Sequence, residues 1–352
     1  MNKCVLFLMV ILSLASCKKD EFNNGKQTIK VGAILPLSGD SAIWGHGVKN
    51  GIELAFDDIS EKTKYNYKFI VEDNTNTNKS TQAIAKKLLH VDKVNAIITV
   101  FDPTANIVAP LASQNKVIHF GSSWFPQFIN YEYSFNIYSN IYSQAQLMKS
   151  LLQSQRASNV VLFTVNQSGF LAGSDVLKEE LSGSNINVCK EIRFNFGQKD
   201  FLIDIAKLMD CVSSTFVINA FSPELDIIVR QLKQVLGNNI KFTGFDLGLN
   251  VDNYELLKGS TYPTIVFPNE AFINKYITKF NDYNYMYGSG IGYVEIKILV
   301  DAFENIGNGT AVPNTEDVSA YIKNKSEIKG VFGDMETDGS GNIFIPVGLM
   351  EI

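Results

Sequence analysis

Residues 29–36 read Ile-Lys-Val-Gly-Ala-Ile-Leu-Pro, a short β-rich run that a proline ends. Apolar residues with helical spacing follow from Val48 to Ile59. The alternation continues to residue 120, with strands predicted at 67–71, 96–100 and 117–120 and helices at 80–91 and 104–114. Strands that alternate with helices form parallel sheets covered on both faces, so this stretch predicts an α/β lobe.

A second run of the same alternation begins after residue 140. It predicts strands at 160–165, 187–192, 216–220 and 241–244, with helices at 174–181, 201–209 and 225–236. The remaining residues show helical patterns at 269–280, 293–306 and 315–324, followed by a turn cluster at 338–342. Two runs of alternation predict two Rossmann-like lobes, each built on a parallel sheet.

The composition is ordinary for a packed globular protein, and 352 residues suggest two domains. The chain has 31 basic and 36 acidic side chains and no basic cluster. Nucleic-acid binding depends on neutralising phosphates, so a nucleic-acid partner is excluded. After the N-terminal leader we expect no membrane span, because charged residues interrupt the apolar run at 291–303.

The N-terminus has the pattern of a secretory signal. Lys3 precedes an apolar run from Val5 to Leu12, and a polar tail follows Cys17. The sequence Leu-Ala-Ser-Cys at 14–17 resembles the bacterial lipobox, which implies cleavage of residues 1–16, acylation of Cys17 and a lipidated tether at 17–27. The protein would then act outside the cytoplasm, anchored to a membrane by lipid. The residues after Cys17 also resemble a surface-export signal. The alternative is an ordinary signal peptide with an accidental Cys17.

Cysteine and histidine give no sign of a metal site. Cys189 and Cys211 lie in no Cys-x-x-Cys or Cys/His cluster, and we expect two buried free thiols, although a disulfide across the intervening helix is compatible with an oxidising compartment. His90 and His119 fall within predicted elements and are expected to be structural. No metal or cofactor is predicted.

Catalytic motifs are also absent from the sequence. There is no Gly-x-Ser-x-Gly elbow, no His-Glu-x-x-His and no phosphate loop. Ser123 follows a strand, where a nucleophile could sit, but no base is evident beside it. A secreted serine hydrolase is therefore a remote alternative.

Polar and aromatic residues gather where predicted strands end, which is where open parallel sheets bind ligands. In the first half these segments are 37–45, 101–104 and 121–124, whose hydroxyl and N–H groups at helix starts suit an anion. In the second half they are 169–173, 220–224 and 244–247. An acidic side chain there, Asp246, would complement the positive end of a zwitterion.

The order and spacing of three motifs resemble the branched-chain amino-acid-binding group of type I periplasmic solute-binding proteins, which serve ABC importers. The motifs are residues 31–39 with Gly45 and 50–55, residues 97–98 with 110–112, and the hairpin at 330–333 with Asp338 and Gly341. The resemblance implies two lobes joined by a three-segment hinge, closing on a ligand between them. It places residues 28–139 and 269–329 in the N-terminal lobe and residues 140–268 and 330–352 in the C-terminal lobe.

The resemblance also implies the ligand site. The first lobe would hold an amino acid's carboxylate, and an acidic residue of the second lobe would receive its ammonium. The residues at the corresponding positions are Trp44, Thr104, Gly121, Ser122, Ser123, Phe170, Phe221 and Asp246. Phe170 and Phe221 stand where tyrosines are common, which makes the cleft more apolar. Asp102 corresponds to no functional residue of the family, and it would repel an anion at the expected binding site of the ligand carboxylate.

The resemblance favours a binding protein without enzymatic activity. Its implied partners are a small-molecule ligand such as an amino acid, an ABC permease, and the membrane through the lipid anchor. A sensory receptor module that reports the ligand to a membrane partner is the alternative that keeps the same fold.

Overall fold

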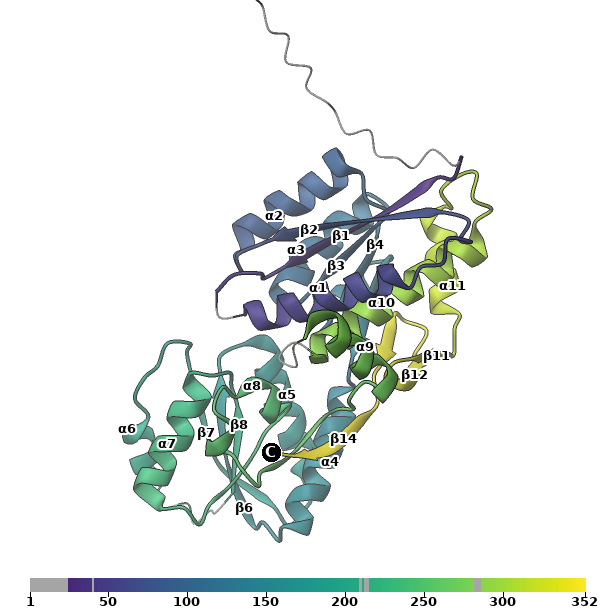
Figure 1. Cartoon of the computed structure of the whole chain (residues 1–352). Helices are drawn as coiled ribbons and strands as arrows, with labels where there is room; N and C mark the ends of the chain where they lie inside the picture. Colours follow the sequence, from purple (N-terminus) through teal and green to yellow (C-terminus); the bar gives the residue numbers. More distant parts are fainter. Residues whose placement is uncertain (1–24, 40, 209–210, 212–214, 282–285) are drawn as a thin grey trace, which may run out of the picture.

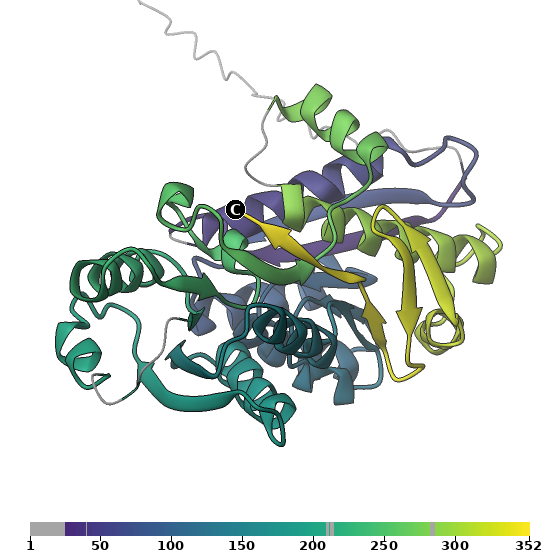
Figure 2. The same ribbon diagram turned by 90° about the horizontal axis from the view of Figure 1, so that it is seen from below.

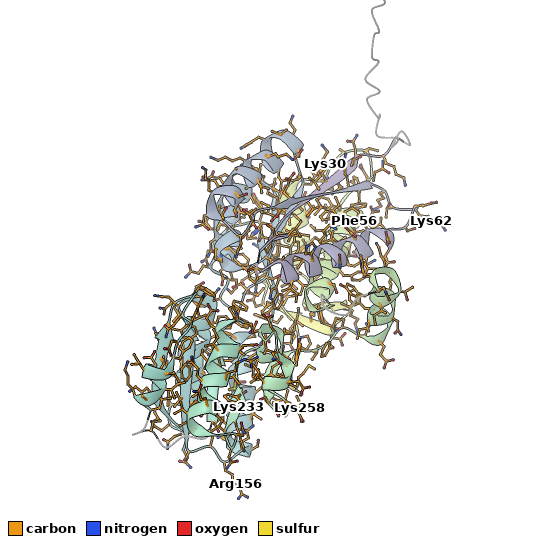
Figure 3. The ribbon with its side chains drawn as sticks, turned by 60° about the vertical axis from the view of Figure 1, so that its left-hand side comes forward. Lys30, Phe56, Lys62, Arg156, Lys233 and Lys258 are labelled. Atoms are coloured by element: carbon orange, nitrogen blue, oxygen red, sulfur yellow. A yellow bond between two sulfur atoms is a disulfide. The ribbon has the colours of Figure 1, made fainter. Side chains whose placement is uncertain are left out.

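The computed structural model describes residues 25–39, 41–208, 211, 215–281 and 286–352. The leader and Cys17 lie outside this part of the chain. Figure 1 shows two α/β lobes, and in Figure 3 Lys30, Phe56 and Lys62 mark the first lobe while Arg156, Lys233 and Lys258 mark the second. The predicted fold class is confirmed. Within the described residues, no helix combines the length and apolar character needed to cross a bilayer.

The first lobe is built on an eight-stranded sheet in the order β11-β12-β13-β5-β4-β3-β1-β2. Its strands from β13 to β2 pair in parallel, whereas β12 pairs antiparallel with both of its neighbours, β11 and β13. The strands are β1 (Thr28–Leu35), β2 (Asn66–Asp73), β3 (Ala96–Thr99), β4 (Ile118–Gly121), β5 (Ser134–Tyr138), β11 (Glu327–Gly330), β12 (Gly333–Thr337) and β13 (Asn342–Phe344). The helices are α1 (Ala42–Asp57), α2 (Asn78–Lys87), α3 (Asp102–Gln114), α9 (Glu270–Phe280), α10 (Met286–Ile306) and α11 (Thr315–Lys323).

The second lobe is built on a four-stranded parallel sheet in the order β7-β6-β8-β9. Its strands are β6 (Asn159–Val165), β7 (Asn187–Phe194), β8 (Thr215–Asn219) and β9 (Lys241–Thr243). Its helices are α4 (Ile141–Ser154), α5 (Ser168–Leu181), α6 (Leu202–Ala206), α7 (Glu224–Leu236) and α8 (Leu247–Asn250).

Three chain segments cross between the lobes. The first leaves β5 for α4, the second follows β10 (Thr261–Ile265), and the third joins β13 to β14 (Val347–Glu351), which pairs antiparallel with β10. Backbone hydrogen bonds tie the segments together: Ile345 N donates to Tyr138 O at 3.0 Å and Val266 N to Pro346 O at 2.9 Å. The crossings therefore form one connected hinge beside the space between the lobes.

The sheet order differs from the expected division at the C-terminal end. Residues 330–352 were expected in the second lobe, yet β12 and β13 extend the first sheet. Only β14 leaves it, which Figure 2 shows as the yellow strand that runs away from the other yellow strands to the C-terminus. The ladder from β11 through β12 to β13 keeps residues 330–344 with the first lobe.

Helices α1 and α10 pack closely along the inner side of the first lobe. A Cβ at Gly51 would overlap the backbone carbonyl of Ser289, and a Cβ at Gly292 would overlap that of Val48. Helix α1 begins at Ala42, six residues before the predicted start at Val48. The sequence pattern missed its first turns because Gly45 and Gly47 interrupt the apolar spacing there. This early start places Trp44 on a helix at the edge of the lobe.

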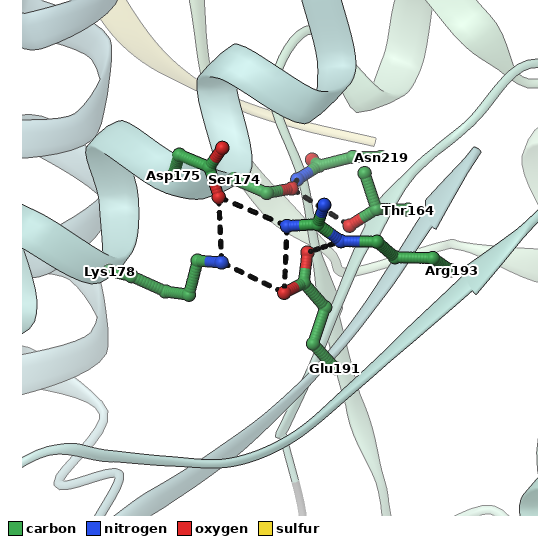
Figure 4. A network of polar contacts seen from close by, with 7 residues as sticks. All are labelled: Thr164, Ser174, Asp175, Lys178, Glu191, Arg193 and Asn219. Atoms are coloured by element: carbon green, nitrogen blue, oxygen red, sulfur yellow. Dashed lines mark hydrogen bonds and ion pairs between the residues drawn. The ribbon is translucent and has the colours of Figure 1, made fainter. Parts of the chain in front are cut away.

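Polar networks tie the parts of the second lobe together (Figure 4). On the surface, Lys178 and Arg193 both pair with Asp175 and Glu191, which joins α5 to the edge strand β7. In the interior, the hydroxyl of Ser174 bonds with Thr164 and accepts from Asn219 Nδ2, each at 2.8 Å.

The expectation of free thiols is wrong, because Cys189 and Cys211 form a disulfide. Cys189 is the bulge residue of β7, at which the pairing with β6 shifts by one residue. Spacing in the sequence could not reveal this shift, which turns the side chain of Cys189 toward the segment before β8.

Removing the disulfide should destabilise the second lobe. The bond closes a loop of 22 residues, for which loop-closure entropy gives about 3 kcal/mol. The double variant Cys189→Ser/Cys211→Ser should lose about this amount in denaturant unfolding, and reductant should then have no further effect. An unchanged unfolding midpoint, or free thiols in the unmodified protein, would contradict the disulfide.

Glu295 on α10 should destabilise the fold at neutral pH. Its side chain is fully buried, both carboxyl oxygens lack a partner within the described residues, and burial raises its pKa well above the usual range. The folded state therefore retains a proton that the unfolded chain releases as pH rises above about 4.5, so stability falls with pH. Glu295→Met should raise the unfolding free energy by about 1–3 kcal/mol at pH 8 and by less at pH 4.5.

The exposed Glu255→Gln is the matched control for Glu295→Met, and it should change little at either pH. A gain from Glu295→Met that is the same at both pH values would show that Glu295 does not titrate in this way.

Candidate functional site

A pocket with an open mouth lies between the two lobes. Strand ends and helix starts of both sheets supply its walls, as expected for open parallel sheets. The first lobe contributes Trp44, Val48, Val100, Phe101, Asp102, Ser122, Ser123, Trp124, Tyr138, Gly288 and Ile291, and the second contributes Gln167, Gly169, Phe221, Asp246 and Asn250.

Five of the eight predicted ligand-binding residues line this pocket: Trp44, Ser122, Ser123, Phe221 and Asp246. Residues 123 and 246, although far apart in the sequence, therefore face a shared space.

The other three predicted residues lie behind the pocket wall. The Thr104 hydroxyl accepts a hydrogen bond from Asn74 Nδ2 at 3.1 Å. A Cβ at Gly121 would overlap the ring of Phe128, so this glycine permits close packing. Phe170 is fully buried, with its ring 5.1 Å from that of Trp124 and 4.8 Å from that of Phe221. These three residues support the wall without lining it.

The turn that carries Asp246 is built by its neighbours. A Cβ at Gly244 would overlap the carbonyl oxygen of Ile218, so only glycine fits there. Asn219, held by Ser174, accepts from the N–H of Phe245 at 3.3 Å, and Asn250 donates to the Phe245 carbonyl at 3.2 Å. Asp246 itself has φ 49°, a left-handed conformation that asparagine and aspartate tolerate. The interior network of Figure 4 thus fixes the acidic residue at the pocket.

Asp246 is 1% exposed, and the donors beside its carboxylate are neutral. Tyr138 donates its hydroxyl at 2.7 Å, from the end of β5 in the first lobe, and Gln144 Nε2 donates at 3.2 Å. Burial raises the pKa of Asp246 to about 6, which these hydrogen bonds partly oppose.

Asp102 is a second buried carboxylate at the same pocket, and the sequence did not predict a role for it. It accepts a short hydrogen bond from the hydroxyl of Ser123 and, from across the cleft, one from Ser168 at 3.4 Å. Burial raises its pKa to about 6 as well. The sequence feature that could have identified Asp102 as a pocket residue is its position just after the end of the predicted strand 96–100.

The groups of Ser123 that were expected to bind a ligand carboxylate therefore make their hydrogen bonds within the protein. The hydroxyl of Ser123 is donated to Asp102, and the N–H of Ser123 is donated to Asn136 Oδ1 at 2.9 Å. Two buried donors nearby have no partner within the described residues, the hydroxyl of Ser122 and the indole N–H of Trp124. Both are neutral.

Aromatic side chains connect the lobes around the pocket. The ring of Phe101 lies 6.2 Å from that of Trp44 and, across the cleft, 6.5 Å from that of Phe221. Phe101 has φ 68° and ψ 147°, a strained conformation for a bulky residue that directs the chain into α3. Trp124 reaches from the first lobe to Phe170 and Phe245 of the second. The sequence missed Phe101, Trp124 and Tyr138 as lining residues.

The described residues contain no cluster of His, Cys, Asp and Glu suited to a metal ion. His119 is fully buried, with ring nitrogens 2.9 Å from the Thr99 hydroxyl and 3.1 Å from that of Ser134, and burial lowers its pKa to about 3. It is a structural residue, as expected. The serine beside the pocket, Ser123, is hydrogen-bonded to a carboxylate and not to a histidine.

The two pocket carboxylates should make the ligand-free protein less stable as pH rises. Both folded pKa values lie near 6 against an ordinary 3.8, so the folded state binds protons more tightly, and stability falls between about pH 4 and pH 6. Each carboxylate contributes a loss of about 3 kcal/mol. In unfolding measurements, Asp102→Asn should reduce the fall of the unfolding free energy between pH 4 and pH 6. The exposed control Asp334→Asn should leave this pH dependence unchanged. An identical slope in the Asp102→Asn variant would contradict the account.

Comparison with known proteins agrees with this geometry. The family model described as periplasmic binding protein matches residues 28–345. A search of curated proteins finds no match.

Solved structures with the same fold cover almost the whole chain. The leucine-binding protein LivK from Thermotoga maritima has 21% identity and a TM-score of 0.80, covering 92% of this chain and 95% of its own. A solute-binding protein of an ABC transporter from R. palustris, in complex with 4-hydroxybenzoate, has 17% identity and a TM-score of 0.81, covering 93% of each chain. LivJ from Streptococcus pneumoniae, in complex with isoleucine, has 18% identity and a TM-score of 0.79, covering 93% of this chain and 96% of its own.

The family is one of binding proteins and not of enzymes, and it implies a location outside the cytoplasm. A match over residues 28–345, with two lobes around a lined pocket, shows that this chain belongs to the periplasmic binding protein family.

Proposed function

We propose that this protein captures a small solute with a protonated amine, such as an amino acid or a similar zwitterion, and delivers it to an ABC importer. The observation that carries this proposal is the position of Asp246. Its carboxylate is buried at the cleft, is held by neutral donors from both lobes, and is not paired with a basic side chain in any described contact. A ligand ammonium would supply the missing charge, and charge-assisted hydrogen bonds contribute about 1.5–3 kcal/mol each.

The walls of the pocket suit the body of such a solute. Trp44, Phe101 and Phe221 enclose it from both lobes, and apolar burial adds about 25 cal/mol per Å². Among the similar structures, LivJ holds isoleucine and the R. palustris protein holds 4-hydroxybenzoate. Here two carboxylates line the pocket, which opposes an aromatic acid whose only charge is negative.

A thermal-melt panel of amines and amino acids tests the proposal. A true ligand at a hundredfold excess over its dissociation constant should add about 2.7 kcal/mol of stability. Asp246→Asn should abolish the shift, because it removes the charge that pairs with the ammonium, whereas Asp334→Asn should retain it. Stabilisation by 4-hydroxybenzoate and by no amine-bearing compound would refute the role of Asp246.

We also propose that Cys17 anchors the protein to a membrane through lipid, as the lipobox at residues 14–17 indicates. In cells, the unmodified protein should sediment with membranes, and Cys17→Ser should release it into the soluble fraction. Mass spectrometry should find an acylated Cys17 as the first residue of the mature chain. An unacylated mature chain that starts elsewhere would exclude the anchor.

A further inference from the structure

We propose that the cleft selects a ligand with net positive charge: a small organic amine with an apolar or aromatic body and no carboxylate group. This inference rests on the proposed function and narrows its ligand class. It is carried by two buried carboxylates, Asp102 and Asp246, that line one aromatic-walled pocket.

Neither carboxylate is compensated by the protein. The groups that hydrogen-bond to the two carboxylates are all neutral. Asp102 accepts from two serine hydroxyls, and Asp246 accepts from a tyrosine hydroxyl and an amide, with further bonds from Thr264 and the backbone of Ile265. None of the described residues that line the pocket is Lys, Arg or His. The internal residues outside the description, 40, 209–210, 212–214 and 282–285, contain no basic residue in their sequence. An uncompensated buried charge is unfavourable, so two such charges at one pocket favour a cationic occupant.

The anion-binding half of a zwitterion site is missing from this pocket. The positive end of α3, where an anion would be attracted, begins with Asp102 itself. The hydroxyl and N–H of Ser123 are both donated within the protein. The unpartnered donors, Ser122 and Trp124, are neutral and suit a ligand hydroxyl or carbonyl. A ligand carboxylate would meet the charge of Asp102.

The walls complement a cation in a second way. Trp44, Phe101, Trp124, Tyr138 and Phe221 all line the pocket. The faces of aromatic rings carry partial negative charge and attract ammonium groups, most strongly where water is excluded. Five aromatic residues with two carboxylates and no described base form a cation-binding environment.

Two matched series test the charge of the ligand by calorimetry at pH 7.5. The first contains phenethylamine, phenylalanine and 3-phenylpropionate, and the second contains 3-methylbutylamine, leucine and 4-methylvalerate. Within each series the body is constant while the charge changes from positive to zwitterionic to negative. We expect at least one amine to bind about tenfold or more tightly than its amino acid, and neither acid to bind.

Asp102→Asn separates this inference from a general need for an ammonium group. The variant keeps an acceptor for Ser123, so the fold should persist, which a melting curve verifies. Its preference for the amine over the amino acid should fall about tenfold or more, because the carboxylate that repels the ligand carboxylate is gone. Asp334→Asn, an exposed control, should keep the preference. The amine should also bind more weakly at pH 5 than at pH 7.5, since Asp102 and Asp246, which with Tyr138 are the described titratable groups of the pocket, become protonated.

Each outcome bears on a different claim. If an amino acid binds as tightly as its amine, the inference is overturned while the proposed function remains. If an acid binds best, or if the Asp102→Asn variant keeps the full preference for the amine, the inference is also overturned. If no compound of either series binds, the inference is rejected. The proposed function is tested separately by the thermal-melt panel: it is rejected if the Asp246→Asn variant shows the same melting shifts as the unmodified protein.

Discussion

The site depends on two carboxylates buried at one cleft without a positive partner among the described contacts. Burial disfavours their charged forms, which is why the pKa values of Asp102 and Asp246 both rise to about 6. Near neutral pH both remain largely ionised, and two buried charges without a positive partner are unfavourable. A cation between the lobes would neutralise these charges. The burial of two carboxylates, which lowers the stability of the free protein, would therefore favour ligand binding and closure of the lobes.

The fold brings these charges together by joining two sheets at their carboxyl ends. Asp102 begins α3 of the first lobe, and Asp246 follows β9 of the second. Contacts that cross the cleft, from Tyr138 to Asp246 and from Ser168 to Asp102, link each acid to the opposite lobe. The crossing segments bond to one another beside the cleft, so hinge motion would separate or unite the two walls as units.

Sequence patterns predicted the layered fold because strand and helix periods alternate clearly in both lobes. They missed β5, α4 and β10, whose short or mixed segments lie at the hinge, and the pairing of Cys189, which depends on a bulge. In the site, the sequence placed Ser123 and Asp246 at the cleft from their positions at strand ends and from the family resemblance. Thr104 and Phe170 lie behind the pocket wall and do not line it. The sequence could not show this, because the direction of a side chain depends on its packing. The direction of Asp102 into the cleft likewise became visible only with its neighbours in place.

A crystal structure of the protein with the solute it carries from its native host tests the central claim most directly. The account predicts density within the aromatic walls, with a ligand nitrogen at hydrogen-bond distance from the carboxylates of Asp102 and Asp246. A ligand carboxylate seated against Ser122 and Ser123 would contradict the preference for a cation, and a ligand bound away from both acids would contradict the whole account.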